Sequence, residues 1–351
     1  MASTVRTKAR PTIHEFDLIR ALHRRHGRRA PSVIQGIGDD AAIITSRAGQ
    51  WTVLTTDLLT EGVHFDLRTA TMADIGFRAA AANLSDIAAM GGTPQHLLVA
   101  LAIPRTGTTR HVHQLYRGMM AACRPHQVGL IGGDTSASSG GWFLSVTLIG
   151  VVPPRQALFR SGARIGDLLY VTGTIGDALA GLRLLNEPPP RTKRAPWTAA
   201  LSTRHRQFLI GRHLRPTARI AEGQWLNTHR FATSAIDISD GLSGDLRHIC
   251  EESHVGADLD LGTLPLSPAC RAYAASRKLD PVDLALTGGE DYELLFTVSP
   301  RQRPRLEQMA LKRGFSLTCI GKIHPLRFGI QAVSPHGRRH RLANTSYEHF
   351  T

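Results

Sequence analysis

The stretch that decides the expected fold reads Ala235-Ile236-Asp237-Ile238-Ser239-Asp240-Gly241-Leu242. Its apolar residues predict a buried strand over 235–238, and a helix is predicted over 242–253. The turn between them carries carboxylates and a glycine, a composition typical of tight connections. The first half of the chain repeats this order of strand, acidic glycine-flanked turn and helix. Such alternation predicts an α/β or α+β architecture.

Two adjacent prolines, Pro153 and Pro154, mark the expected domain boundary, because they interrupt a β-branched stretch. We expect an N-terminal domain of residues 1–152 and a C-terminal domain of residues 153–351. In the first, strands are predicted over 41–46, 51–56, 97–103, 128–131 and 142–152, and helices over 15–25, 74–90 and 109–124. In the second, strands are predicted over 168–172, 235–238, 292–298 and 315–320, and helices over 177–185, 216–226, 242–253 and 304–312. The Pro-rich, basic residues 186–205 predict a surface connector.

The composition is that of an ordinary globular protein. The chain has 351 residues, of which 42% are apolar and 20% charged. No apolar run approaches the roughly 20 residues that span a bilayer, and the first residues lack the apolar core of a secretory signal. We therefore expect a cytoplasmic protein without a membrane partner. The four cysteines are widely separated, which favours reduced thiols over a zinc site.

The net charge of +14 is the unusual feature of the composition. Such a field attracts anions, so the excess arginine indicates a solvated surface, an anionic small substrate or nucleic acid. Basic residues gather at 24–29, 191–194 and 338–341, without interleaved aromatic residues or a known nucleic-acid-binding pattern. We therefore predict no nucleic-acid partner.

The acidic residues, in contrast, gather in six clusters within or beside apolar stretches. The clusters read Gly38-Asp39-Asp40, Thr55-Thr56-Asp57, Asn83-Leu84-Ser85-Asp86, Gly132-Gly133-Asp134-Thr135, Asp237-Ile238-Ser239-Asp240-Gly241 and Gly288-Gly289-Glu290-Asp291. Buried carboxylates are costly without a positive partner, and no Lys or Arg occurs within any of the clusters. Hard oxygen ligands suit Mg²⁺, so the pattern predicts an enzyme that handles phosphates through several Mg²⁺ ions.

Each cluster also has a simpler interpretation. Asp39 and Asp40 fit an ordinary turn, and Ser239 or Asp240 fits a helix cap. Residues 55–57 are expected at a strand end, where hydroxyl and carboxylate oxygens suit a metal, but a turn would also explain them. The glycines of 132–135 are expected to form a turn that approaches a phosphate, although no P-loop motif occurs in the chain.

Asn83 and Asp86 are three residues apart on a predicted helix and therefore share one face. Apolar residues surround the pair, so either core hydrogen bonds or a functional site must satisfy its polar atoms. His64 has no Ser or Cys nucleophile pattern around it, and covalent catalysis is therefore not predicted.

Taken together and in this order, the motifs resemble the thiamine-monophosphate kinases, relatives of the aminoimidazole ribonucleotide synthetases and selenophosphate synthetases. The resemblance covers nearly the whole chain. It rests on GIGDDAA at 36–42, TTDLLTEGVHF at 55–65, NLSDIAAMGG at 83–92, GGDT at 132–135, FRSGARIGD at 159–167, IDISDGL at 236–242 and GGEDYEL at 288–294.

The resemblance implies transfer of the ATP γ-phosphate to thiamine monophosphate, directly, in line and with several Mg²⁺ ions. It implies that metal ions are held by Asp39, Thr55, Thr56, Asp57, Asp86, Asp134, Asp237 and Asp240. ATP would contact Gly133, Asp134, Arg160 and Ser239, and the thiamine substrate would contact His64, Glu290 and Tyr347. The sequence departs from the family pattern around Tyr347, with Ser346 in place of glycine and Glu348 in place of aspartate.

The fold implied by the resemblance is a two-domain, synthetase-like α/β (α+β) arrangement. Its N-terminal sheet domain would form a β-barrel with the same domain of a second copy in a homodimer. Its C-terminal α/β domain would close a cleft over ATP.

Other families stay open as alternatives. An aminoimidazole ribonucleotide synthetase is the nearest, although IDISDGL and GGEDYEL favour the kinase. A selenophosphate synthetase would carry a reactive Cys near the N-terminus, whereas the first cysteine here is Cys123. A hydrogenase-maturation relative would end in cysteine, whereas this chain ends in Thr351. A basic nucleic-acid-binding protein without catalysis is opposed by the acidic clusters, which would repel a polyanion.

Overall fold

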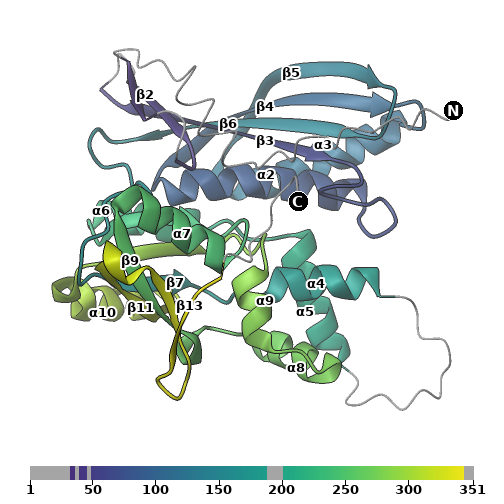
Figure 1. Ribbon diagram of the computed structural model, residues 1–351. Helices are drawn as coiled ribbons and strands as arrows, with labels where there is room; N and C mark the ends of the chain where they lie inside the picture. Colours follow the sequence, from purple (N-terminus) through teal and green to yellow (C-terminus); the bar gives the residue numbers. More distant parts are fainter. Residues whose placement is uncertain (1–31, 36–38, 46–48, 188–200, 344–351) are drawn as a thin grey trace, which may run out of the picture.

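Helix α2 (Met72–Ala89) lies between two β-sheets, one built from the first half of the chain and one from the second (Figure 1). The computed structural model describes residues 32–35, 39–45, 49–187 and 201–343. The predicted helix over 15–25, most of the predicted connector and Tyr347 lie outside the described residues.

The first sheet has the order β1-β2-β3-β6-β4-β5. Its strands are β1 (Val33–Gln35), β2 (Ala42–Thr45), β3 (Trp51–Thr60), β4 (Thr93–Pro104), β5 (Gly129–Ser138) and β6 (Phe143–Val152). Neighbours pair antiparallel except β4 and β5, which are parallel and are connected through α3 (Thr109–Cys123). Within the described part of this single chain the sheet is open, with β1 and β5 at its edges.

The second sheet has the order β13-β12-β9-β11-β7-β10-β8 and is antiparallel except for the pair β9 and β12. Its strands are β7 (Leu168–Thr172), β8 (Ala232–Asp237), β9 (Val255–Asp260), β10 (Leu294–Val298), β11 (Leu317–Pro325), β12 (Ile330–Val333) and β13 (Arg339–Arg341). Its helices are α4 (Asp177–Asn186), α5 (Thr203–Leu214), α6 (Ile220–Thr228), α7 (Leu242–Ser253), α8 (Pro268–Arg277), α9 (Pro281–Thr287) and α10 (Arg303–Arg313). The expected mixed α/β architecture is confirmed.

Helix α2 begins with a capping box, in which Thr71 and Asp74 satisfy each other's backbone N–H groups. Its alanines are buried on nearly every side, because the helix packs on the first sheet and also contacts α6 and β8. The largest core cluster accordingly joins Val53 of the first sheet to Phe296 of the second. The two halves thus share a core, and the expected boundary after residue 152 stays a prediction.

Several predicted elements need correction. The strand expected over 51–56 continues to Thr60, so residues 55–57 lie inside β3 and not at its end. The glycine turn expected at 132–135 is part of the ten-residue strand β5. Helix α5 occupies the end of the expected connector, and α6 begins at Ile220, four residues after the proline that was expected near its first turn. Strands β1, β9, β12 and β13 and helices α8 and α9 were not predicted.

Within the described ranges, no helix combines the length and the apolar character that crossing a bilayer requires.

Candidate active site

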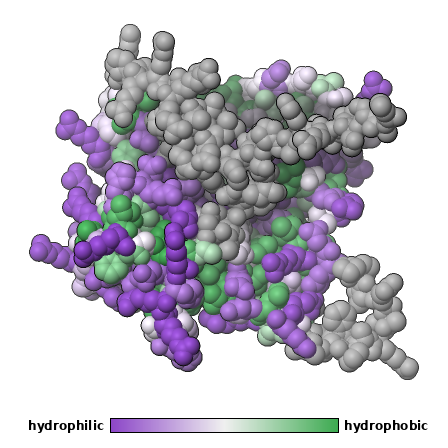
Figure 2. All heavy atoms as spheres, viewed as in Figure 1, coloured by the Kyte–Doolittle hydropathy of each residue, from purple (hydrophilic) through white to green (hydrophobic). Residues whose placement is uncertain are grey.

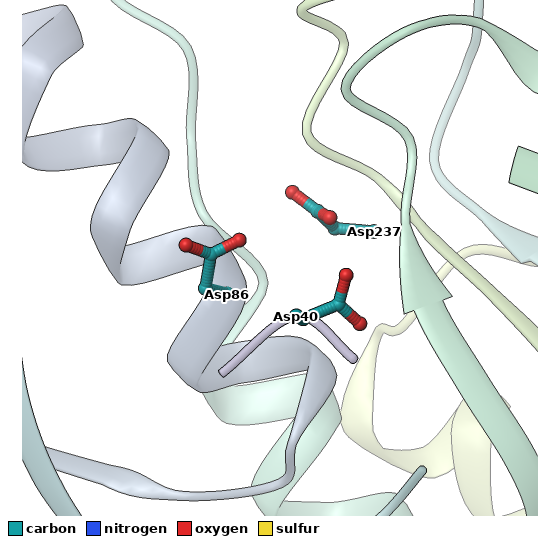
Figure 3. A group of neighbouring side chains, drawn as sticks. All are labelled: Asp40, Asp86 and Asp237. Carbon is teal, nitrogen blue, oxygen red and sulfur yellow. The ribbon is translucent and has the colours of Figure 1, made fainter. Parts of the chain in front are cut away.

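Three carboxylates converge where the two halves of the chain meet (Figure 3). Asp40 precedes β2, Asp86 projects from the last turns of α2, and Asp237 ends β8. One oxygen of each lies within 4.8 Å of one oxygen of each of the others. Residues almost 200 positions apart in the sequence therefore share one acidic cluster, as expected if they hold a common cation.

Neighbouring hydroxyl groups and one arginine satisfy part of this cluster. The Thr55 hydroxyl donates a short hydrogen bond to Asp86, and the Ser85 hydroxyl donates to Asp237 Oδ2 at 2.6 Å. Arg160 Nη2 donates to Asp40 Oδ1 at 2.5 Å. One cation faces three carboxylates, so the cluster keeps an excess of negative charge.

That excess raises the pKa values of the cluster. Burial, with the charge of Asp40 adding to it, raises the pKa of Asp237 to about 8. Burial and the charges of Asp57 and Asp237 raise the pKa of Asp86 well above its ordinary value. Burial also raises the pKa of Asp40, although Arg160 opposes the shift. Without a metal, the folded protein therefore holds protons here that a divalent cation would displace.

The acidic region extends to Asp57 and Asp240. Because side chains alternate along a strand, Asp57 shares the face of β3 that Thr55 presents to Asp86. Burial and the charge of Asp240, in the turn before α7, raise the pKa of Asp57 to about 6. Thr56 points to the opposite face, where its hydroxyl donates to the Val146 carbonyl at 3.2 Å. Thr56 therefore brings no side-chain oxygen to this side of the sheet.

Asp39 lies beside Asp40 and accepts the backbone N–H of Arg160 at 3.2 Å. Burial and the charge of Asp40 raise the pKa of Asp39 to about 7, although Arg160 opposes the shift. No Lys or Arg occurs within this cluster of the sequence, but Arg160 reaches the pair from 120 residues away, so a metal is not its sole source of positive charge. Asp40, which the sequence interpretation did not assign as a ligand, lies closer to the other carboxylates than Asp39 does.

Asp245 is an acidic residue of this region that the sequence interpretation missed. It lies in the first turn of α7 with an exposed fraction of 1%, and its Oδ2 accepts the Gly241 N–H at 3.1 Å. Burial and the charges of Asp240 and Asp237 raise its pKa well above the ordinary value. A carboxylate at a helix N-terminus is a recognisable signal. Asp245 was overlooked because it follows the glycine-flanked turn and does not belong to it.

Gly133 and Asp134 lie on the edge strand β5, where both are exposed, and not in the carboxylate cluster. A Cβ at Gly133 would lie 1.9 Å from the Val99 carbonyl oxygen of β4. The close pairing of β4 and β5 therefore requires this glycine, whatever ligand its backbone meets.

The motifs around Ser239 and Glu290 pack directly on each other. The Glu290 N–H donates to the Ser239 carbonyl at 2.8 Å, and a Cβ at Gly289 would lie 2.4 Å from that same oxygen. The Glu290 carboxylate forms a short ion pair with Arg78 of α2, and His213 Nδ1 of α5 lies 3.2 Å from its Oε2. Burial alone would raise the pKa of Glu290, but Arg78 and His213 outweigh it and lower that pKa to about 2.

The remaining acidic residues of GGEDYEL form a helix cap and buried ion pairs. Asp291 accepts the N–H groups of Gly176 and Ala178, and so caps the start of α4. Glu293 is fully buried between Arg212 and Arg219, with Arg212 Nη2 2.8 Å from its Oε1. These arginines lie some 80 residues away in sequence, so the motif alone could not reveal them.

His64 follows β3, and its Nδ1 accepts the Thr60 N–H at 3.0 Å. This contact fixes the ring over the strand end but does not place it in the carboxylate cluster. Tyr347 lies outside the described residues.

The donors of the cluster fit a hard divalent cation. All are oxygen atoms, three come from carboxylates, and Thr55 adds a hydroxyl within the same group. Nitrogen or sulfur ligands, which softer transition metals prefer, are absent from this described group. Magnesium is the common cellular ion that such a set suits.

Comparisons with known proteins show which sequences and structures the chain resembles. The family model for AIR synthase related protein, N-terminal domain, matches residues 38–152. The thiamine-monophosphate kinase of Escherichia coli (strain K12) is 40% identical over 312 residues, which cover 88% of this chain and 90% of the relative.

Two solved structures show the same likeness. One, AaThiL complexed with AMPPCP and TMP, has a TM-score of 0.81 at 32% identity and covers 98% of this chain and 99% of its own. The other, the thiamine-monophosphate kinase from Stenotrophomonas maltophilia K279a, has a TM-score of 0.72 at 38% identity and covers 93% of this chain and 96% of its own. Because the identity extends over most of both sequences, the chain belongs to the thiamine-monophosphate kinase family.

Proposed function

We propose that this protein transfers the γ-phosphoryl group of ATP to thiamine monophosphate and releases thiamine diphosphate and ADP. The observation that carries the proposal is the convergence of Asp40, Asp86 and Asp237 from both halves of the chain. The complex of AaThiL with AMPPCP, an ATP analogue, and TMP supports the two substrates. Transfer between two phosphates needs positioning and charge neutralisation more than a covalent nucleophile.

The carboxylate region would hold Mg²⁺ ions through Asp39, Thr55, Asp57, Asp86, Asp237 and Asp240, with Asp40 now added from the geometry. Of the other two ligands that the resemblance implies, Thr56 turns its side chain to the opposite face of β3 and Asp134 lies on the edge strand β5, outside the cluster. Bound Mg²⁺ supplies charge neutralisation for the phosphate oxygens. Asp40 and Asp237 each keep a fixed orientation through Arg160 and Ser85, so the chain presents preformed oxygen ligands.

We assign the nucleotide to Gly133, Asp134, Arg160 and Ser239. Arg160 suits phosphate because guanidinium forks onto its oxygens, and it already lies beside the acidic cluster. The thiamine substrate is assigned to His64, Glu290 and Tyr347. The Glu290 carboxylate is paired with Arg78. This ion pair would hold the carboxylate in a fixed position for contact with the substrate.

A homodimer with a shared β-barrel would complete the first sheet, and the boundary between the proposed domains would follow residue 152. The edge strand β5 supports this proposal, because nearly all of it is exposed, including Leu130 at 41% and Ile131 at 56%. Leu58 of β3 is likewise 56% exposed. Apolar side chains on an open edge favour pairing with another sheet.

The alternative is an aminoimidazole ribonucleotide synthetase type of reaction, because the N-terminal family model that matches is described as AIR synthase related protein. A coupled assay of ADP release separates the two, with thiamine monophosphate in one series and formylglycinamidine ribonucleotide in the other. We expect Mg²⁺-dependent ADP release, with thiamine diphosphate as product, only in the first series. ADP release only in the second would overturn the proposed kinase activity.

A further inference from the structure

A second concave site lies beside the C-terminal half of α7, away from the carboxylate cluster. Its cavity has a volume of about 460 Å³ and is lined by α7, the turn Leu326–Phe328, β12 and the end of β13 with the residue that follows it. Arg247 of α7 faces this cavity. Asp245, two residues earlier, faces the acidic region, and residues two apart on a helix point to different sides. The two sites are therefore separate.

The cavity concentrates positive charge. Arg247, Arg327 and Arg341 line it, with Glu251 as its one lining carboxylate. In the part of the chain that the structure describes, none of these three arginines forms an ion pair. The Nε atom of Arg247 is buried without a hydrogen-bond acceptor. A buried donor left without an acceptor is costly, and three cations that line one cavity repel one another, so an anion would relieve both.

A neighbouring arginine, Arg339, has the carboxylate partner that the three lining arginines lack among the described residues. Arg339 of β13 lies 3.1 Å from Asp258, a carboxylate that His324 also contacts at 3.0 Å. The Asp258 carboxylate is thus already shared, and Arg339 contrasts with the three arginines that line the cavity without an ion pair to any described residue. Figure 2 shows apolar side chains bordered by strongly hydrophilic ones on this part of the molecule. Phe328, 46% exposed, lies within the cavity lining.

We propose that this cavity, the Arg247 site, binds a small anion that carries phosphate groups, independently of the active site. Guanidinium groups fork onto phosphate oxygens, and three of them suit a polyvalent phosphate better than a single carboxylate. The concave shape and the single lining aromatic ring favour a small molecule over a nucleic-acid strand, which needs an extended groove with several stacking rings. This site gives the strongly basic composition a specific use.

Calorimetric titration of inorganic pyrophosphate into the full chain tests the proposal. EDTA is included, so that the metal-free carboxylate cluster repels the probe. We expect one binding site in the wild type, and affinities lowered at least about tenfold by Arg247→Gln and by Arg341→Gln. Arg338→Gln is the matched control, because Arg338 belongs to the same basic run but does not line the cavity. Its affinity should equal that of the wild type.

Arg341 lies on an exposed strand, so its variant keeps the test valid even if Arg247→Gln fails to fold. The proposal is overturned if the wild type does not bind pyrophosphate. It is equally overturned if Arg338→Gln weakens binding as much as the two lining variants, because the charge would then act diffusely. Displacement of pyrophosphate only by long oligonucleotides would identify a nucleic-acid surface instead.

Discussion

Asp86 illustrates how function and stability oppose each other at one side chain. Its carboxylate is held among Asp40, Asp57 and Asp237, which repel it unless a cation intervenes. Asp86→Asn keeps an oxygen that accepts from Thr55 but removes a charge. We expect turnover to fall about a hundredfold or more. In EDTA, the midpoint of thermal unfolding should stay equal or rise.

The control for Asp86→Asn is Asp66→Asn, because Asp66 pairs with Arg68 at the surface, outside the cluster. It should leave turnover unchanged. Full activity of Asp86→Asn at limiting Mg²⁺ would contradict the role of Asp86 as a metal ligand.

Arg78 gives the corresponding prediction for stability. Its side chain is 3% exposed and pairs with Glu290, whose side chain is 29% exposed, so Arg78→Ala removes a buried guanidinium and leaves His213 as the basic neighbour of that carboxylate. Loss of one partner of such a pair should lower the free energy of unfolding by about 3–5 kcal/mol. Arg215→Ala breaks the pair with Asp74 through a side chain that is 56% exposed, and should cost less than about 1 kcal/mol. Denaturant unfolding at pH 7 measures both, and equal losses would refute the distinction.

Strand β5 depends on a glycine for its close pairing with β4. Gly133→Ala would bring a Cβ to 1.9 Å from the Val99 carbonyl oxygen, so β5 could no longer pair closely with β4. We expect a loss of at least about 2 kcal/mol in the free energy of unfolding. Gly129→Ala, on the same strand with nothing within 4 Å of the new Cβ, should change it by less than about 0.5 kcal/mol. Urea unfolding of both variants measures these free energies. An unchanged free energy of unfolding in Gly133→Ala would contradict the requirement for close pairing of β4 and β5.

The sequence predicted helix α2 and strand β7 closely, because long alanine-rich and apolar runs leave little choice. It failed at β5, where glycine and aspartate indicate a turn but pairing with β4 dominates. It also failed at α5, whose mean hydropathy is low and whose neighbours are rich in proline.

The candidate site was likewise only partly predictable from the sequence. The acidic motifs were visible in the sequence, whereas their arginine partners Arg78 and Arg160 meet them only through tertiary contacts over 100 residues away. No local pattern in the sequence carries that information.

The complete metal-free protein should lose stability as the pH rises. The pKa values of Asp57, Asp39 and Asp237 are raised by burial and by neighbouring carboxylates to about 6, 7 and 8. An aspartate whose folded pKa is raised stabilises the fold below its unfolded pKa, near 4, and this contribution is lost as the pH passes the folded pKa. The midpoint of thermal unfolding in EDTA should therefore fall between pH 5.5 and 8.5.

Mg²⁺ should reduce that fall, because the cation takes the place of the protons. Asp291, with a pKa raised to about 7 by burial, lies outside the cluster. Its contribution to the fall of the unfolding midpoint with pH should therefore stay the same when Mg²⁺ is added. The lowered pKa of Glu290, about 2, acts only in strong acid and does not affect this range. An identical pH dependence with and without Mg²⁺ would count against a cation in the cluster.

Calorimetric titration of Mg²⁺ into the nucleotide-free protein at pH 8 addresses the cluster most directly. We expect saturable binding to the wild type and to Asp66→Asn, and an affinity at least about tenfold lower in Asp40→Asn and in Asp237→Asn, each of which removes one of the converging carboxylates. Equal Mg²⁺ affinity in all four proteins, or no binding to the wild type, would contradict the claim that these aspartates converge to hold a divalent cation.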